Sequence, residues 1–167
     1  TLIAALSAAR PKIADYPFTT LVPNLGVVRR PTGDGTVFAD IPGLIEGAHT
    51  GLGLGHEFLR HIERTRVLLH VIDATAEHPL GAYQTIQQEL QAYGKSLTDR
   101  PQIVALNKVD AVDPDQLAAV TAELNARFSV SAHHISAVTG TGLPTLLQAV
   151  WAQLDQCQSQ AEIANIP

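Results

Sequence analysis

The sequence predicts an α/β fold built on a mostly parallel sheet. From residue 67 onward, short apolar runs of strand length alternate with longer segments of helical periodicity, an order that winds helices over both faces of a parallel sheet. One run, Ile103-Val104-Ala105-Leu106, is apolar at every position, as expected of a strand buried on both faces. Polar residues follow the runs, at the strand ends where open α/β sheets bind ligands. The strand-like runs cover residues 67–72, 103–106 and 130–135, and the helical segments cover residues 79–97, 113–128 and 142–154.

The first part of the chain predicts a helix, a loop and a hairpin. Residues 1–9 are good helix formers with apolar residues at helical spacing. Residues 12–23 contain two prolines and paired threonines, which exclude a central strand and predict a loop. Residues 25–29 and 36–41 read as two strands, and the turn between them, residues 31–35, carries two glycines.

Composition indicates one soluble domain. The 167 residues are 46% hydrophobic, include no apolar run of membrane-spanning length and carry a net charge of −5, which gives no overall attraction to nucleic acid or anionic membrane. The single cysteine, Cys157, excludes an internal disulfide and fits a reducing cytosol. No methionine is present and the chain opens in a helical pattern, so we expect the sequence to be an excerpt from a longer protein.

Directly behind the apolar strand stands Asn107-Lys108-Val109-Asp110, which we interpret as a base-recognition loop. The Asp110 carboxylate can accept hydrogen bonds from both N1–H and the exocyclic amine of guanine, whereas adenine has an acceptor at N1 and no amine at C2. Asn107 can meet N7 and brace the loop. The aliphatic stem of Lys108 can lie over the purine face with its ammonium near the ribose or phosphates. For these four residues taken alone, a polar turn after a strand is the alternative.

Asp40-Ile41-Pro42-Gly43 follows the second strand of the hairpin and suits a metal-linked phosphate site. The Asp40 carboxylate can hold a water on Mg²⁺. The N–H of Gly43 can approach a terminal phosphate oxygen because glycine has no side chain in the way. A tight turn after a strand is again the alternative for this motif alone.

The motifs together resemble the G motifs of P-loop GTPases. They are the threonine-bearing loop, Asp-x-x-Gly, Asn-Lys-x-Asp and Ser136-Ala137-Val138, in that order. The amino-acid sequences of residues 12–26, 40–47 and 53–66 resemble the GTPase domain of the Obg family. The resemblance implies a P-loop NTPase-like three-layer sandwich whose mostly parallel sheet has one antiparallel edge strand. It also implies a partial GTPase domain over residues 1–155 and a weakly ordered tail or linker at residues 156–167.

The resemblance also implies a role for each matching residue. Thr20 would coordinate Mg²⁺ directly and sense the γ-phosphate, and Asp40 would hold the same ion through water. The N–H of Ala137 would donate to guanine O6, the acceptor that adenine lacks. No catalytic residue is assigned. The expected GTP-binding residues are Phe18, Thr19, Thr20, Leu21, Val22, Asp40, Ile41, Pro42, Gly43, Asn107, Lys108, Val109, Asp110, Ser136, Ala137 and Val138.

Two departures from the GTPase pattern affect what is expected. Many small GTPases have, after the Asp-x-x-Gly glycine, a glutamine that orients the attacking water. Leu44 stands there and has no polar group, so we expect slow intrinsic hydrolysis or help from another group. The first strand and the phosphate-cradling GxxxxGK[ST] loop, the Walker A loop, are missing from residues 1–167. We therefore expect the chain as written to fold poorly and to bind nucleotide weakly, and the complete protein to be a working GTPase.

The resemblance thus implies an Mg²⁺-dependent GTP hydrolase that acts as a cytoplasmic switch, with the large ribosomal subunit as partner and neither membrane nor DNA. The alternative is a non-hydrolysing guanine-nucleotide sensor or ribosome-binding module, which Leu44 and the missing loop favour. An ATP-binding or phosphotransfer domain is a third hypothesis, against which Asp110 argues. Basic residues in and after an expected helix at residues 56–64 could face ribosomal RNA, although ordinary surface charge is the simpler account. These are Arg60, Arg64 and Arg66.

Overall fold

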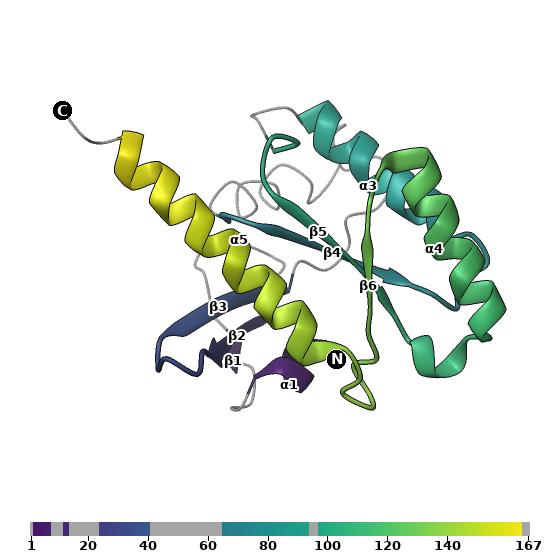
Figure 1. The fold of residues 1–167 in the computed structure, drawn as a ribbon, viewed down its shortest axis with the longest axis horizontal. Helices are drawn as coiled ribbons and strands as arrows, with labels where there is room; N and C mark the ends of the chain where they lie inside the picture. Colours follow the sequence, from purple (N-terminus) through teal and green to yellow (C-terminus); the bar gives the residue numbers. More distant parts are fainter. Residues whose placement is uncertain (1, 8–11, 14–23, 41–64, 94–96, 165–167) are drawn as a thin grey trace.

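The computed structural model describes residues 2–7, 12–13, 24–40, 65–93 and 97–164 (Figure 1). Residues 14–23 of the expected loop at residues 12–23 lie outside the described residues, as does the expected helix at residues 56–64. The elements in chain order are α1 (Leu2–Leu6), β1 (Lys12–Ile13), β2 (Asn24–Arg29), β3 (Gly35–Asp40), β4 (Leu68–Asp73), α3 (Pro79–Tyr93), β5 (Gln102–Asn107), the 3₁₀ helix η2 (Val109–Ala111), α4 (Pro114–Phe128), β6 (Ala132–His134) and α5 (Leu143–Ala164).

A parallel sheet forms the second half of the molecule and confirms the predicted α/β class. Its strand order is β4-β5-β6, so β5 is central and receives hydrogen bonds from both sides. The register pairs Asp73 with Asn107 and Leu106 with His134. Because parallel strands point the same way, the carboxyl ends of all three meet at one edge of the sheet.

The hairpin strands form a second, antiparallel sheet of order β1-β2-β3. The β2–β3 ladder runs from Asn24 opposite Asp40 to Arg29 opposite Gly35, as the glycine-containing turn predicts. The two residues of β1 pair with β2, although the sequence led us to expect a loop there. Among the described residues no ladder joins β3 to β4, so the antiparallel pairing lies in a sheet of its own rather than at the edge of the parallel one.

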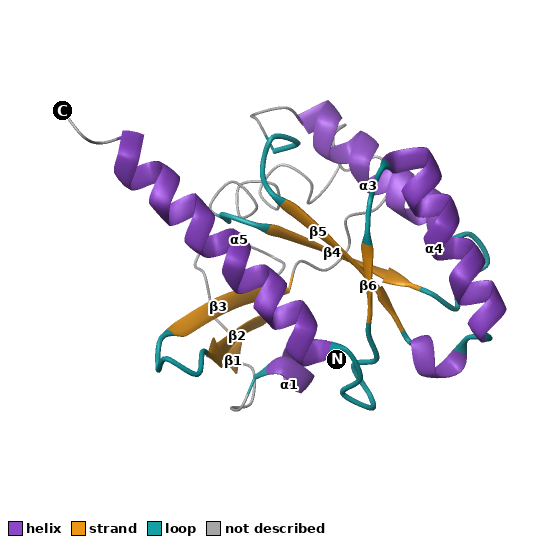
Figure 2. Ribbon diagram, viewed as in Figure 1, coloured by secondary structure: helices purple, strands orange, loops and turns teal. Residues whose placement is uncertain are grey.

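Alternation along β5 explains the layers of the parallel half. Ile103 and Ala105 belong to the cluster beneath α5, whereas Val104 and Leu106 belong to the cluster beneath α3 and α4. Successive side chains of a strand point to opposite faces, so an all-apolar strand is matched to helices on both sides. Figure 2 shows α5 on one side of this sheet and α3 and α4 on the other, which gives the three-layer order that the sequence predicts.

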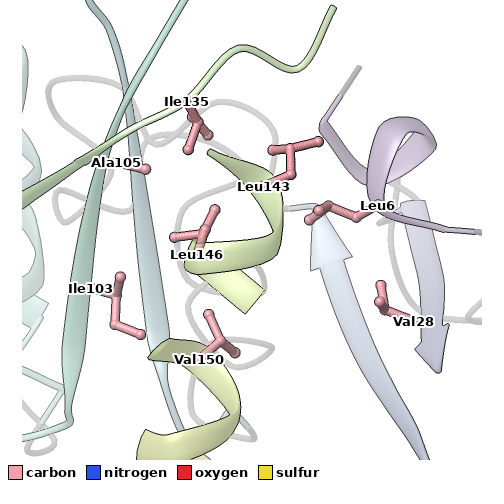
Figure 3. Close-up of a cluster of buried hydrophobic side chains, with 8 residues drawn as sticks. All are labelled: Leu6, Val28, Ile103, Ala105, Ile135, Leu143, Leu146 and Val150. Carbon is pink, nitrogen blue, oxygen red and sulfur yellow. The ribbon is translucent and has the colours of Figure 1, made fainter. Parts of the chain in front are cut away.

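Helix α5 packs against side chains of both sheets. Its side chains Leu146 and Val150 point toward β5, while Leu6 of α1 and Val28 of β2 lie on the other side of the same cluster (Figure 3). An ion pair of 2.7 Å between Arg30 Nη1 and Asp155 Oδ1 adds a polar link from the β2–β3 turn to α5. Within the described residues, the antiparallel sheet is therefore held against the rest by packing of apolar side chains and by this ion pair, not by strand pairing.

Helix boundaries follow local capping chemistry. Asp113 caps α4, because its Oδ1 accepts a hydrogen bond of 2.9 Å from the Asp115 N–H, and Pro114 occupies the first turn as predicted. The sequence predicts that the last helix ends at residue 154, but α5 continues to Ala164, so residues 156–164 are helical rather than part of a weakly ordered tail. The domain division itself stays a prediction. None of the described helices combines the length and hydropathy needed to cross a bilayer.

Burial of His70 predicts that stability depends on pH. This β4 side chain packs edge-on against Tyr83 of α3, with ring centroids 5.6 Å apart, and burial lowers the pKa of His70 from its ordinary 6.5 to about 4. Between these two pH values His70 is protonated in the unfolded chain but neutral in the folded protein. Stability should therefore fall as the pH drops from about 6.5 to about 4, by up to about 3 kcal/mol.

The test of this prediction is urea unfolding, at several pH values in that window, of the protein extended at its N-terminus through the Walker A loop. His70→Phe keeps a ring against Tyr83 but cannot be protonated, so its unfolding free energy should change less over the window than that of the unsubstituted protein. His78→Gln replaces an exposed histidine and serves as the control. Equal slopes in the unsubstituted protein and in His70→Phe would contradict the prediction.

Candidate functional site

The candidate site lies where the strands of the parallel sheet end. Asp73 ends β4, Asn107 ends β5, and the loop that begins at Ile135 follows β6. This is the edge at which open α/β sheets bind ligands. The structure thus brings together two of the four predicted motifs, Asn107-Lys108-Val109-Asp110 and Ser136-Ala137-Val138.

Asn107 ties the three strand ends to one another. Its backbone carbonyl accepts a hydrogen bond of 2.9 Å from the Ala74 N–H, just beyond β4. Its side-chain Oδ1 accepts a hydrogen bond of 3.0 Å from the Ala137 N–H, in the loop after β6. The brace expected of Asn107 is therefore present. The same bond occupies the N–H that the resemblance assigns to guanine O6, so that assignment stays a prediction and requires this hydrogen to be shared or released.

Lys108 adopts a backbone conformation that non-glycine residues rarely enter. Its φ of 67° and ψ of 32° are left-handed, which costs about 1–2 kcal/mol outside glycine. Two hydrogen bonds of the peptide unit after Lys108 fix this turn. One runs from the Val109 N–H to the Ile135 carbonyl (3.2 Å) and the other from the Ala111 N–H to the Lys108 carbonyl (3.0 Å). Strain held in place by its surroundings is a feature of functional sites.

Asp110 stands on the short helix η2 with its side chain exposed. The backbone around it is held at Asn107, Val109 and Ala111 by the bonds described above. A carboxylate has two acceptor oxygens and no donor. The structure therefore presents an exposed carboxylate, with two acceptor oxygens, on a loop whose backbone is held in place.

The loop after β6 is built around a buried serine. Ser136 is fully buried, and its Oγ accepts a hydrogen bond of 3.1 Å from the Thr139 N–H. Its N–H donates to the Thr141 carbonyl at 3.0 Å and its carbonyl accepts from the Gly140 N–H at 2.9 Å. Ser136 thus shapes the loop from inside, whereas Val138 is 78% exposed at its outer side.

Asp73 is a residue of the site to which the sequence motifs assign no role. Its Oδ2 lies 2.6 Å from Lys108 Nζ, and its Oδ1 accepts hydrogen bonds from the Thr75 N–H (2.9 Å) and hydroxyl (2.6 Å). The Lys108 ammonium, and after it the Thr75 hydroxyl, holds the pKa of Asp73 below its ordinary value. The sequence signal is a carboxylate at the end of a strand, which becomes informative only once that strand is known to neighbour β5.

Of the remaining predicted residues, the structure describes Asp40 alone. Asp40 is the exposed last residue of β3, in the antiparallel sheet. In the part of the chain that the structure describes, no group of three or more His, Cys, Asp or Glu side chains could hold a metal ion. The predicted residues that lie outside the described part are Phe18, Thr19, Thr20, Leu21, Val22, Ile41, Pro42 and Gly43.

Comparison with known proteins identifies the family of this chain. A family model described as 50S ribosome-binding GTPase matches residues 1–108. The chain is 66% identical over 167 residues to GTPase Obg of Crocosphaera subtropica, covering 100% of this chain and 49% of that protein. It is 71% identical over 154 residues to GTPase Obg of Thermosynechococcus vestitus, covering 92% of this chain and 46% of that protein. The chain thus spans about half the length of the curated relatives it matches.

Solved structures with low sequence identity share the fold. The G domain of the T. maritima FeoB iron transporter superposes with a TM-score of 0.67 at 19% identity, over 92% of this chain and 89% of that one. A putative nucleolar GTP-binding protein 1 from Plasmodium falciparum superposes with a TM-score of 0.64 at 16% identity, over 98% and 84%. Fold and loops together define a GTPase domain of the P-loop class. The chain belongs to the 50S ribosome-binding GTPase family, and its resemblance to the Obg GTPases is confirmed.

Proposed function

We propose that this chain is the base-reading part of a switch that binds guanine nucleotides and slowly hydrolyses GTP with Mg²⁺. The observation that carries the proposal is the 3.0 Å bond between Asn107 Oδ1 and the Ala137 N–H. This bond joins the two loops to which the resemblance assigns base recognition, on the sheet edge where Asp110 is exposed. A site fixed before the ligand arrives loses less conformational freedom on binding.

Hydrogen-bond polarity makes this site selective for guanine. The carboxylate of Asp110 accepts from N1–H and from the exocyclic amine, and both donors are absent from the corresponding edge of adenine. An adenine nucleotide would leave the carboxylate desolvated and unpaired, which costs more than the missing bonds themselves. Guanine nucleotides are therefore the expected ligands and ATP is the expected non-ligand.

Mg²⁺ fits the residues assigned to it by their chemistry. Asp40 offers an exposed carboxylate at the end of β3, an oxygen donor of the kind that hard cations prefer. Asp40 would hold the ion through water and Thr20 would hold it directly, and the bound ion would neutralise charge on the phosphates. Leu44 offers no hydrogen bond to an attacking water, so intrinsic hydrolysis is expected to be slow.

A ribosomal partner is supported by the family description, 50S ribosome-binding GTPase. We propose that the complete protein acts in the cytoplasm during large-subunit assembly, where the γ-phosphate orders its switch loops and hydrolysis releases them. Leu44 favours a second candidate, a sensor that binds guanine nucleotide without hydrolysing it. Phosphate release, measured with and without large ribosomal subunits, separates the two: release above background supports the switch, and none under either condition supports the sensor.

The base-reading assignment is tested by titration with a fluorescent GDP analogue in Mg²⁺, competed by unlabelled GDP and ATP. We expect displacement by GDP and not by ATP. The chain as written should bind weakly, and a form extended at its N-terminus through a Walker A loop should bind tightly, because that loop supplies backbone N–H groups to the phosphates. Displacement by ATP as readily as by GDP would overturn the assignment.

A further inference from the structure

Asp73 contacts the base-reading loop although none of the four GTPase motifs includes it. The register of the parallel sheet places Asp73 directly opposite Asn107, so that Lys108 follows one residue beyond the pair. The Asp73 carboxylate and the Lys108 ammonium meet there at 2.6 Å. Neighbouring strand ends, rather than nearby positions in the sequence, create this contact across 35 residues.

The two oxygens of Asp73 have separate partners. Oδ1 accepts from both the N–H and the hydroxyl of Thr75, at 2.9 and 2.6 Å, and this holds the carboxylate in one orientation. Oδ2 is thereby aimed at Lys108 Nζ. Hydrogen bonds that involve charged groups are stronger than neutral ones. Both groups are charged at neutral pH, and the Lys108 ammonium lowers the pKa of Asp73 further below its ordinary value.

The ion pair with Asp73 restricts a lysine side chain that is otherwise exposed to solvent. A free lysine side chain samples many rotamers, and ordering it on binding costs conformational entropy. The left-handed backbone of Lys108 and the ion pair at its tip fix both ends of this side chain. Its aliphatic stem, which is the part expected to lie over the purine, is then ordered before the ligand arrives.

We propose that Asp73 is a positioning residue for guanine-nucleotide binding, which acts through Lys108 by holding its side chain in the binding conformation. The inference rests on the function proposed above. The proposal adds the carboxyl end of β4 to the binding site. The four motifs do not include a residue from this strand. Asp73 does not contact the base in this proposal and is not a catalytic residue.

The test is a double-mutant cycle in GDP affinity, measured on the protein extended through the Walker A loop. Asp73→Asn removes the charge but keeps an oxygen that can accept from Thr75, so the turn after β4 is retained. We expect Asp73→Asn to weaken GDP binding by about three- to fivefold, because both members of the ion pair are exposed. Lys108→Met keeps an unbranched apolar stem without the ammonium, and in that background Asp73→Asn should change the affinity less than twofold.

The matched control is Glu123→Gln, which removes the carboxylate of the 2.6 Å Glu123–Arg127 ion pair on α4 and should leave GDP affinity unchanged. An equal loss with and without Lys108→Met overturns the proposal, because Asp73 would then act through the general fold. No loss, or tighter binding, in Asp73→Asn also overturns it. If the unsubstituted protein binds GDP and ATP equally, the proposed function fails first and this role fails with it.

Discussion

Asp110→Asn should lower the affinity for GDP by at least about 100-fold and raise the affinity for xanthosine diphosphate. The Asn side chain offers one acceptor and one amine, so its amine would face the exocyclic amine of guanine, donor against donor. Xanthine carries a carbonyl at that position, which accepts from the Asn amine, while its N1–H donates to the Asn oxygen. A loss of about 100-fold corresponds to about 2.7 kcal/mol, within the range expected when a buried polar pair is mismatched.

The readout is competition by GDP and by xanthosine diphosphate against one fluorescent nucleotide, in the protein extended through the Walker A loop. Asp115→Asn is the charge-matched control, because Asp115 is also exposed and lies on α4, outside the base-reading loops. That variant should bind both nucleotides like the unsubstituted protein. A parallel loss for GDP and xanthosine diphosphate in Asp110→Asn would show that the residue supports the loop rather than reads the base.

The sequence is informative for the fold where a residue pattern has one physical solution. Four apolar residues in succession in β5 need helices on both faces, and the structure places α5 over Ile103 and Ala105 and the pair α3 and α4 over Val104 and Leu106. The predicted end of α5 is wrong because residues 156–164 contain neither proline nor glycine and show only weak apolar spacing. The helix propensity of these residues is sufficient for the helix to continue, and no proline or glycine marks its end in the sequence.

The sequence predicts those parts of the candidate site whose residues are close together in the chain. Asn107, Lys108 and Asp110 are close neighbours, so the proposal of guanine recognition can be argued from their side chains and their spacing alone. The role of Asp73 cannot, because it depends on which strand lies beside β5 and in what register. The bond from Ala137 to Asn107 is of the same kind, since it joins loops after different strands. Pairings across strand ends are properties of topology rather than of any short motif.

Gly142→Ala should destabilise the protein by about 3 kcal/mol or more, as a sum of backbone strain and a steric clash. Gly142 has a φ of +72°, which alanine adopts only at a cost. A Cβ at this position would also lie 2.1 Å from the carbonyl oxygen of His134, at the end of β6. Because that oxygen belongs to the backbone of a strand, it cannot turn aside as a side chain would, and α5 would have to move away from the sheet.

Gly140→Ala separates the two contributions. Gly140 also has a left-handed φ, of +82°, but a Cβ there would meet no atom within 4 Å, so only the backbone cost of about 1–2 kcal/mol is expected. Urea unfolding of both variants measures the difference, which should be about 1–3 kcal/mol in favour of Gly140→Ala. Equal destabilisation of the two variants would mean that α5 can move away from β6 at little cost in free energy. The predicted clash would also displace the loop from Ser136 to Thr141, so Gly142→Ala should weaken GDP binding even under conditions in which the protein stays folded, whereas Gly140→Ala should not.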